Sequence, residues 1–216
     1  MLRASHHMNP ETQFLIGLME LQYGQKIQSK LRQLSPQVPW ARGWPEDKQA
    51  FWNAEAFMWS RKIEQGTRAV IERELKSLAT GKNLDLGCGA YSYIPSVGLD
   101  LSSQMLHLNA RCYEKVRGDL EEKLPFEDKE FDSVTAVFVL NYVQNYAQLL
   151  QEIHRVLKPA GKFLVVGAAS INQWQRQKQV HSFNAGEWRR KLEKEEFRVT
   201  SSRKIGWWFL KGAKKR

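Results

Sequence analysis

Cysteine is scarce in this chain, and long apolar runs are absent. Only 2 of the 216 residues are cysteine, which excludes a small scaffold held together by disulfides. No stretch approaches the roughly 20 apolar residues of a membrane span, and the N-terminus lacks the apolar segment of a secretory signal. His6 and His7 stand in a polar lead-in, and no metal site is predicted. We therefore expect a soluble, cytoplasmic protein without a membrane span.

The composition suits one large core, because 42% of the residues are hydrophobic. We expect an N-terminal helical extension over residues 1–80 and a main domain over residues 81–216. The net charge of +10 lies mostly near the C-terminal end, where residues 171–216 hold 13 Lys and Arg against 4 Asp and Glu. This basic segment is either an attractive surface for RNA phosphates or a solvated helix face.

The spacing of apolar residues predicts helices first and a sheet later. A helix is expected from about residue 10 to 34, begun by Asn9 and Pro10, and further helix in two pieces from Asp47 to Leu78. From Asn83, short apolar strands alternate with helices, which is typical of an α/β fold with a mostly parallel sheet. Strands are expected at 83–86, 97–101, 115–118, 131–138, 162–167, 197–202 and 207–210, and helices at 103–110, 146–157 and 185–194.

A glycine-rich turn follows the first of these strands. The segment Asp85-Leu86-Gly87-Cys88-Gly89 lets the backbone turn sharply and approach a ligand without a Cβ atom in the way. The next strand leads to Asp100, an acid placed to accept hydrogen bonds from two ribose hydroxyls. The third glycine of a GxGxxG dinucleotide motif is missing, and Asp85 would repel a diphosphate but attract the amino group of a methionine moiety. The two acids favour S-adenosylmethionine (SAM) over a nicotinamide dinucleotide.

Five motifs occur in order between residues 84 and 167. They are DLGCG at 85–89, GLDLSSQML at 98–106, GDLEEKLPFEDKEFDSV at 118–134, FVLNYV at 138–143 and LLQEIHRVLKPAGKFLVV at 149–166. Together they resemble the class I SAM-dependent methyltransferases of the small "type 11" kind. The resemblance implies a Rossmann-like, seven-stranded, mostly parallel sheet sandwiched by helices, SAM as the cofactor, and methyl transfer as the activity.

The resemblance also implies which residues contact SAM. The glycine-rich turn would line its methionine half, Asp100 would hold the ribose, and the next two strand ends would surround the adenine. Asn141, after the fourth strand, would face both the cofactor and the acceptor. The residues assigned to SAM in this way are Asp85, Gly87, Cys88, Gly89, Asp100, Leu101, Met105, Asp119, Leu120 and Asn141.

The first crossover of the sheet departs from the family pattern. Tyr91 stands at the third glycine position, and only ten residues separate Gly89 from Asp100, too few for a crossover helix of three turns with its loops. Pro95 also ends any helix there. We predict no regular helix longer than about one turn over residues 90–95. Tyr91 and Tyr93 either cover the cofactor or serve as packing groups.

A dedicated general base is optional in this chemistry. SAM carries its methyl group on a positively charged sulfur, so the protein mainly aligns the acceptor and excludes water. The candidates for a base, all weak, are His181, Tyr142 and His154, in that order. His181 follows the fifth strand, where the family often shapes its acceptor site, or is an exposed loop histidine. Tyr142 suits a pocket lining, and His154 suits a helix surface.

Aromatic residues flank the sheet region, since all eight tryptophans lie outside residues 81–170. Trp52, Glu55 and Trp59 share one helix face. This face suits an acceptor pocket beneath a helical lid formed by residues 1–80. Alternatively, the aromatic residues fix these helices to the main domain.

The acceptor is expected to be a small molecule. After the fourth strand the chain reads Asn141-Tyr142-Val143-Gln144, without the Asn/Asp-Pro-Pro-Tyr/Phe motif of many enzymes that methylate exocyclic base nitrogens. An RNA methyltransferase, whose basic segment 171–216 follows the phosphates, is the first alternative. A noncatalytic SAM-fold protein that binds or activates another protein is the second.

Overall fold

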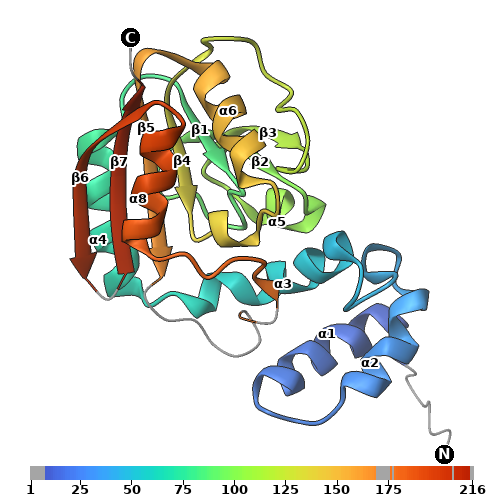
Figure 1. The fold of residues 1–216 in the computed structure, drawn as a ribbon. Coiled ribbons are helices and arrows are strands. Elements are labelled where there is room, and N and C mark those ends of the chain that lie inside the picture. The colour runs from blue at the N-terminus through green and yellow to red at the C-terminus, as the bar shows by residue number, and fades with distance from the viewer. Residues whose placement is uncertain (1–7, 169–175, 177, 206, 215–216) are drawn as a thin grey trace, which may run out of the picture. The chain divides into compact units, whose positions relative to one another are not determined.

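The computed structural model describes residues 8–168, 176, 178–205 and 207–214. The chain forms two compact units, residues 1–62 and 63–216 (Figure 1). The sequence-based boundary at residue 80 thus differs from the division into compact units, which places the helix α4 (Gln65–Leu78) with the sheet. None of the helices in the described part of the chain has the length and apolarity of a membrane span.

Over its described residues, the N-terminal unit contains three α-helices, α1 (Pro10–Gln22), α2 (Gln28–Leu34) and α3 (Lys48–Lys62), and two short 3-10 helices, η1 (Ser35–Gln37) and η2 (Pro39–Ala41). The single helix predicted over residues 10–34 is wrong, because the chain turns at Gly24, whose φ of +83° does not occur inside an α-helix. The predicted start is confirmed, since the Asn9 side chain accepts a hydrogen bond from the Thr12 amide at 2.8 Å. Phe14 is fully buried, with the Trp40 and Trp44 rings each 5.6 Å from it.

The predicted acceptor face on α3 is described only in part. Trp52 and Glu55 lie on α3, and Glu55 is buried. The side chain of Trp59 lies outside the described residues. The lid formed by residues 1–80 therefore stays a prediction.

The second unit is a seven-stranded sheet in the order β3-β2-β1-β4-β5-β7-β6. The first five strands along the chain pair in parallel, and β7 is antiparallel to both β5 and β6. This confirms the predicted mostly parallel α/β sheet. The strands are β1 (Asn83–Leu86), β2 (Ser96–Asp100), β3 (Cys112–Arg117), β4 (Phe131–Val137), β5 (Leu157–Ala168), β6 (Phe197–Ile205) and β7 (Trp207–Lys214).

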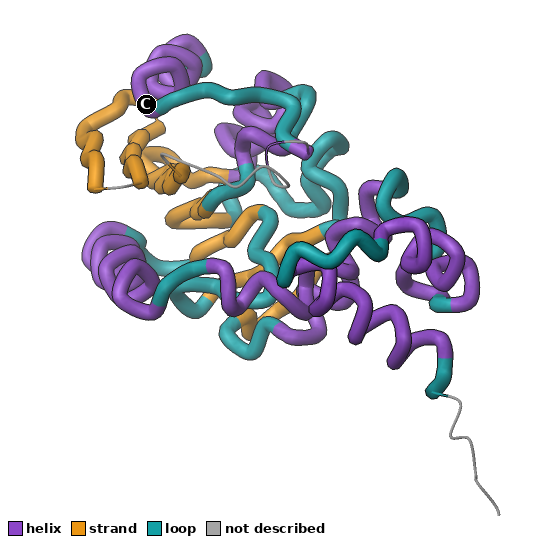
Figure 2. Tube along the Cα trace, turned by 90° about the horizontal axis from the view of Figure 1, so that it is seen from below, coloured by secondary structure: helices purple, strands orange, loops and turns teal. Residues whose placement is uncertain are grey.

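Helices cover both faces of this sheet (Figures 1 and 2). Successive residues of a strand point to opposite faces, and β5 shows this directly. Leu164 and Val166 pack with Ile71 and Leu75 of α4. The alternate β5 residue Phe163 belongs to the larger core, which also contains buried residues of α6 (Tyr146–Val156) and α8 (Ala185–Lys194). The burial of apolar residues from both layers is the main stabilising contribution to this unit.

Several strands extend beyond their predicted ends. β3 begins at Cys112 rather than Lys115, β5 begins at Leu157 rather than Lys162, β6 reaches Ile205 and β7 reaches Lys214. β3 forms one edge of the sheet and is mostly exposed from Tyr113 to Lys115. An exposed edge strand carries no apolar pattern from which its ends could be read.

The crossover between β1 and β2 contains no helix, which confirms the prediction for residues 90–95. The β2–β3 and β4–β5 connections contain the predicted helices α5 (Ser103–Leu108) and α6. The parallel pairing of β1 with β2 is intact, with Asp85 opposite Gly98. A short, helix-free connection therefore joins two adjacent parallel strands.

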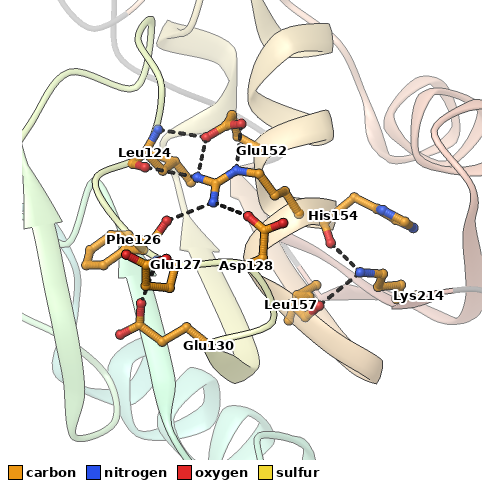
Figure 3. Close-up of polar contacts among 10 residues, drawn as sticks. Leu124, Phe126, Glu127, Asp128, Glu130, Glu152, His154, Leu157 and Lys214 are labelled. Atoms are coloured by element: carbon orange, nitrogen blue, oxygen red, sulfur yellow. Dashed lines mark hydrogen bonds and ion pairs between the residues drawn. The ribbon is translucent and has the colours of Figure 1, made fainter.

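A half-buried arginine fixes the long loop between β3 and β4 to α6. Arg155 donates to the carbonyl oxygens of Leu124 at 3.0 Å and Phe126 at 2.7 Å, and pairs with Glu152 at 2.7 Å. The Lys214 ammonium donates to the carbonyl oxygens of His154 and Leu157 at the end of the same helix (Figure 3). The two contacts of Lys214 supply donors to carbonyl groups at the C-terminal end of α6, which lack partners inside the helix.

Candidate cofactor site

A turn with two glycines follows β1, beside the end of β2. Gly87 and Gly89 have φ values of +57° and +58°, in the left-handed region that disfavours side chains. A Cβ atom on Gly87 would also collide with the Val139 side chain. The predicted sharp turn at residues 85–89 is therefore present, and its backbone lies at the carboxyl edge of the sheet, where ligands of such folds bind.

Asp100 ends β2 and faces this turn. One carboxylate oxygen accepts from the Gly89 amide at 2.9 Å, and the other accepts from the Ser102 amide at 2.8 Å. The helix cap is a different residue, because the Ser102 hydroxyl accepts from the Met105 amide of α5 at 3.1 Å. A carboxylate has about four acceptor positions, and the backbone amides of Ser102, Gly89 and Leu101 contact that of Asp100, so acceptor capacity remains for a ribose hydroxyl.

Asp85 is the second buried acid of the site, with 4% of its surface exposed. Its two oxygens accept from the hydroxyls of Ser92 at 2.6 Å and Thr135 at 2.8 Å. Burial is the main cause that raises the pKa of both Asp85 and Asp100 to about 6, and the negative charge of Asp100 contributes to the rise at Asp85.

Within the described part of the chain, neither acid forms an ion pair with a cationic side chain. Two buried acids without a cation create a strongly negative local environment. SAM fits this environment, because it carries positive charge on its sulfur and on its amino group. The two carboxylates of the site therefore suit SAM, the cofactor that the sequence motifs predict.

The remaining residues assigned to SAM lie around the same edge. The Gly118 amide donates to the Asp100 carbonyl at 3.1 Å, which brings the segment after β3 beside the end of β2. Asp119 and Leu120 follow directly, and Leu120 is buried. Met105 is buried on α5. Their contacts with an adenine ring stay a prediction.

The comparison with known proteins agrees with this geometry. Residues 84–165 match the family model described as a methyltransferase domain, and the relatives of this region are class I SAM-dependent methyltransferases. SAM is the cofactor of this family.

Three relatives show how far the similarity of this methyltransferase domain extends. Sterol 4-C-methyltransferase strm-1 from Caenorhabditis elegans is 40% identical over 146 residues, covering 56% of this chain and 42% of that protein. Demethylmenaquinone methyltransferase from Staphylococcus saprophyticus is 35% identical over 111 residues, covering 44% and 47%. The chain thus spans less than half of either protein. A solved SAM-dependent methyltransferase from Thermotoga maritima shares the fold, with a TM-score of 0.64 at 17% identity over 76% of this chain and 98% of that one.

Asn109 of the methyltransferase domain holds the glycine turn, and sequence reasoning missed it. It is fully buried after α5. Its side-chain amide donates to the Gly89 carbonyl at 2.9 Å and to the Ser92 hydroxyl at 3.0 Å, while its oxygen accepts from the amides of Ser92 at 3.3 Å and Arg111 at 3.1 Å. One side chain thus joins the glycine turn, the helix-free crossover and the start of β3. An asparagine after a helix predicts at most a local cap.

The guanidinium group of Arg111 also binds this crossover between β1 and β2. Arg111 donates to the Tyr93 carbonyl at 2.9 Å and the Tyr91 hydroxyl at 3.0 Å, and pairs with Glu72 of α4 at 2.8 Å. Hydrogen bonds from Arg111 and Lys76 lower the pKa of Glu72 to about 2. Tyr93 is buried in the cluster around α4, and Tyr91 packs against that cluster. Both tyrosines are therefore packing groups in this structure.

Asn141, the last residue assigned to SAM, contacts the segment before α8. Its side-chain amide donates to the Phe183 carbonyl at 3.3 Å, and its oxygen accepts from the Trp188 indole at 3.0 Å. Its backbone carbonyl accepts from the amides of Val180 and His181. Asn141 thus joins the end of β4 to the segment around His181. A contact with the cofactor stays a prediction.

The structure separates the three candidate bases. His181 lies beside the β4 edge, where its Nε2 is 3.1 Å from the Gln144 carbonyl oxygen and its ring stacks on Phe183 at 4.7 Å. Tyr142 is half-buried in the short helix η3 (Leu140–Tyr142) at the same edge. His154 lies near the opposite end of α6, and its ring packs 5.7 Å from Phe197. His181 and Tyr142 remain candidates, and the position of His154 suits packing.

Proposed function

We propose that this protein transfers a methyl group from SAM to a small-molecule acceptor. The observation that carries the proposal is the pair of buried acids, Asp85 and Asp100, at adjacent strand ends around a turn with two positive-φ glycines. The proposal for the acceptor is supported by the relatives, whose names specify a sterol and demethylmenaquinone. We also propose a cytoplasmic location, because both cysteines are free thiols and disulfides are rare in the cytosol.

The residues of the site have separate tasks in this proposal. SAM, when bound, supplies a methyl group on a positively charged sulfur. Asp100 accepts hydrogen bonds from the ribose, and Asp85 contributes negative charge that attracts the cationic end of the cofactor. The segment joined by Asn141, including His181, borders the acceptor. His181 or Tyr142 accepts a proton where the acceptor must lose one.

RNA is the second candidate acceptor, and one surface feature favours it. Arg190, Lys191 and Lys194 line a hollow of about 300 Å³ beside Tyr146, at the start of α6. Glu187 and Glu195 line the same hollow and reduce its positive charge. A cationic surface near the strand ends would bind phosphate groups of RNA.

The acceptor is tested by a transfer screen with methyl-labelled SAM. Cell extract is divided into a small-molecule fraction, an RNA fraction and a nuclease-treated RNA fraction. We expect label in the small-molecule fraction. Label confined to nuclease-sensitive RNA would replace the small-molecule proposal by the RNA one, and SAM binding without transfer to any fraction would support a noncatalytic SAM-fold partner.

SAM should raise the melting temperature of the protein. A ligand that binds only the native state stabilises it by RT ln(1 + [L]/Kd), about 2.7 kcal/mol at a hundredfold excess over Kd. For a chain of this size this corresponds to a shift of roughly 5–10 °C. Differential scanning fluorimetry with SAM, S-adenosylhomocysteine and NADH measures it. No shift with millimolar SAM would remove the support for the cofactor.

Lowering the pH from 7 to 5 should weaken SAM binding by about tenfold or more, because Asp85 and Asp100 have pKa values of about 6 and protonation removes the charge that faces the cation. Calorimetric titration at pH 5, 6 and 7 measures this change. S-adenosylhomocysteine, which lacks the sulfonium charge, is the control and should respond less steeply. Equal affinities of SAM at pH 5 and 7 would contradict the assigned role of the two acids.

Unfolding does not explain such a loss of binding at pH 5. The folded pKa values of both acids exceed their unfolded value of about 4. The folded state therefore binds more protons between about pH 4 and 6, and the contribution of these acids to stability falls as the pH rises through this window. At pH 5 the free protein gains stability from these two groups relative to pH 7.

A further inference from the structure

The two cysteines of the chain meet over Gly98, although 23 positions separate Cys88 from Cys112. Cys88 lies in the glycine turn after β1, Cys112 begins β3, and β2 runs between them. A Cβ atom on Gly98 would collide with the Cys112 sulfur and would lie 2.9 Å from the Cys88 sulfur. The glycine thus leaves the space in which both thiols stand next to each other.

Both thiols are free and buried, and they differ in reactivity. Cys88 and Cys112 are 5% and 7% exposed. A hydrogen bond with Cys88 lowers the pKa of Cys112, whose sulfur also lies 3.2 Å from the Ser92 hydroxyl. The same hydrogen bond and burial raise the pKa of Cys88. Cys112, on the edge strand of the sheet, is therefore the better nucleophile of the pair.

We propose that Cys88 and Cys112 form a reversible disulfide that switches off the cofactor site when the protein meets a peroxide. The Cys112 thiolate attacks hydrogen peroxide, which breaks the O–O bond and gives a sulfenic acid and hydroxide. The Cys88 sulfur then attacks the sulfenic sulfur, the S–O bond breaks, and water leaves. In total, two thiols lose two electrons and two protons, and one peroxide becomes two waters.

The bridge would act on cofactor binding through the backbone of the glycine turn. An S–S bond of about 2.05 Å requires the two sulfurs to move closer than two thiols in contact. Cys88 stands between Gly87 and Gly89, and its amide donates to the Leu99 carbonyl at 3.1 Å. Drawing Cys88 toward β3 displaces Gly89, whose amide bonds Asp100. This part of the inference rests on the proposed SAM site.

The experiment compares reduced, peroxide-treated and re-reduced protein. Intact mass and peptide mapping should show the loss of two hydrogens and a linked Cys88–Cys112 peptide. Calorimetric titration should show a loss of SAM affinity of about tenfold or more on oxidation, restored by dithiothreitol. Over-oxidised thiols without a linked peptide would overturn the inference, and so would a linked peptide with unchanged affinity.

Cys112→Ala and Cys112→Ser are the matched control variants, because Cys112 is not among the residues assigned to SAM. Both variants should bind SAM like the wild type and should keep that affinity after peroxide treatment. A variant that loses SAM affinity under peroxide as the wild type does would overturn the inference. Reduced protein that binds no SAM would contradict the proposed function, while the linked peptide would still decide whether the bridge forms.

Discussion

Replacing Asp100 with alanine should lower SAM affinity by about two orders of magnitude or more and leave the sheet folded. Asp100 is placed at the end of β2, with acceptor capacity left after its bonds to the amides of Gly89 and Ser102. Hydrogen bonds from ribose hydroxyls to its carboxylate are of the charge-assisted kind. Each contributes about 1.5–3 kcal/mol, or roughly one to two decades of affinity.

The measurement is a calorimetric titration of the variant with SAM, together with its melting temperature. Ser102→Ala is the matched control, because it removes the cap of α5 and leaves the carboxylate in place. The control should lose about 1 kcal/mol of stability and bind SAM within about threefold of the wild type. Asp100→Ala with nearly wild-type affinity would show that Asp100 serves only the local turn.

The sheet and the positions of the two acids could be predicted from sequence. Apolar strands alternating with helices require parallel pairing, and parallel strands place their carboxyl ends at one edge. Asp85 and Asp100 therefore had to lie close together. The absence of a helix over residues 90–95 followed from spacing and Pro95. Each of these inferences depends on local pattern or chain length alone.

The break at Gly24 was harder to predict. A glycine inside a helix costs only about 1 kcal/mol relative to alanine, so the apolar spacing on both sides dominated the prediction. The chain instead adopts a φ of +83° at Gly24 and starts a second helix at Gln28. Leu31 of this helix is fully buried. The burial of Leu31 depends on tertiary contacts, which the local sequence pattern does not indicate.

The side chains that hold the glycine turn and the crossover after it could not be predicted from the sequence either. Asn109 bonds to Gly89, twenty positions earlier, and Arg111 bonds to Glu72, 39 positions earlier. No periodic pattern links such residues. The short crossover signalled that something must replace the missing helix, but it did not indicate which side chains do so.

Asn109→Ala should remove this support and destabilise the domain by about 3 kcal/mol, since it leaves several buried polar groups, each costing about 1–3 kcal/mol, without partners. Those groups include the Gly89 carbonyl and the Ser92 amide. SAM affinity should fall together with stability, because the glycine turn is no longer held. Thermal unfolding and calorimetric titration at a temperature well below the transition measure the two effects.

A variant that is equally unstable for another reason separates positioning from general instability. Leu192 is fully buried on α8, and Leu192→Ala should cost about 2–5 kcal/mol without touching the glycine turn. It should bind SAM normally while folded. Asn109→Asp keeps the acceptor oxygen for the Ser92 and Arg111 amides but loses the donor to Gly89 and adds charge near Asp85, so its SAM affinity should fall as in Asn109→Ala. If all three variants bind SAM alike, Asn109 stabilises the fold without positioning the cofactor turn.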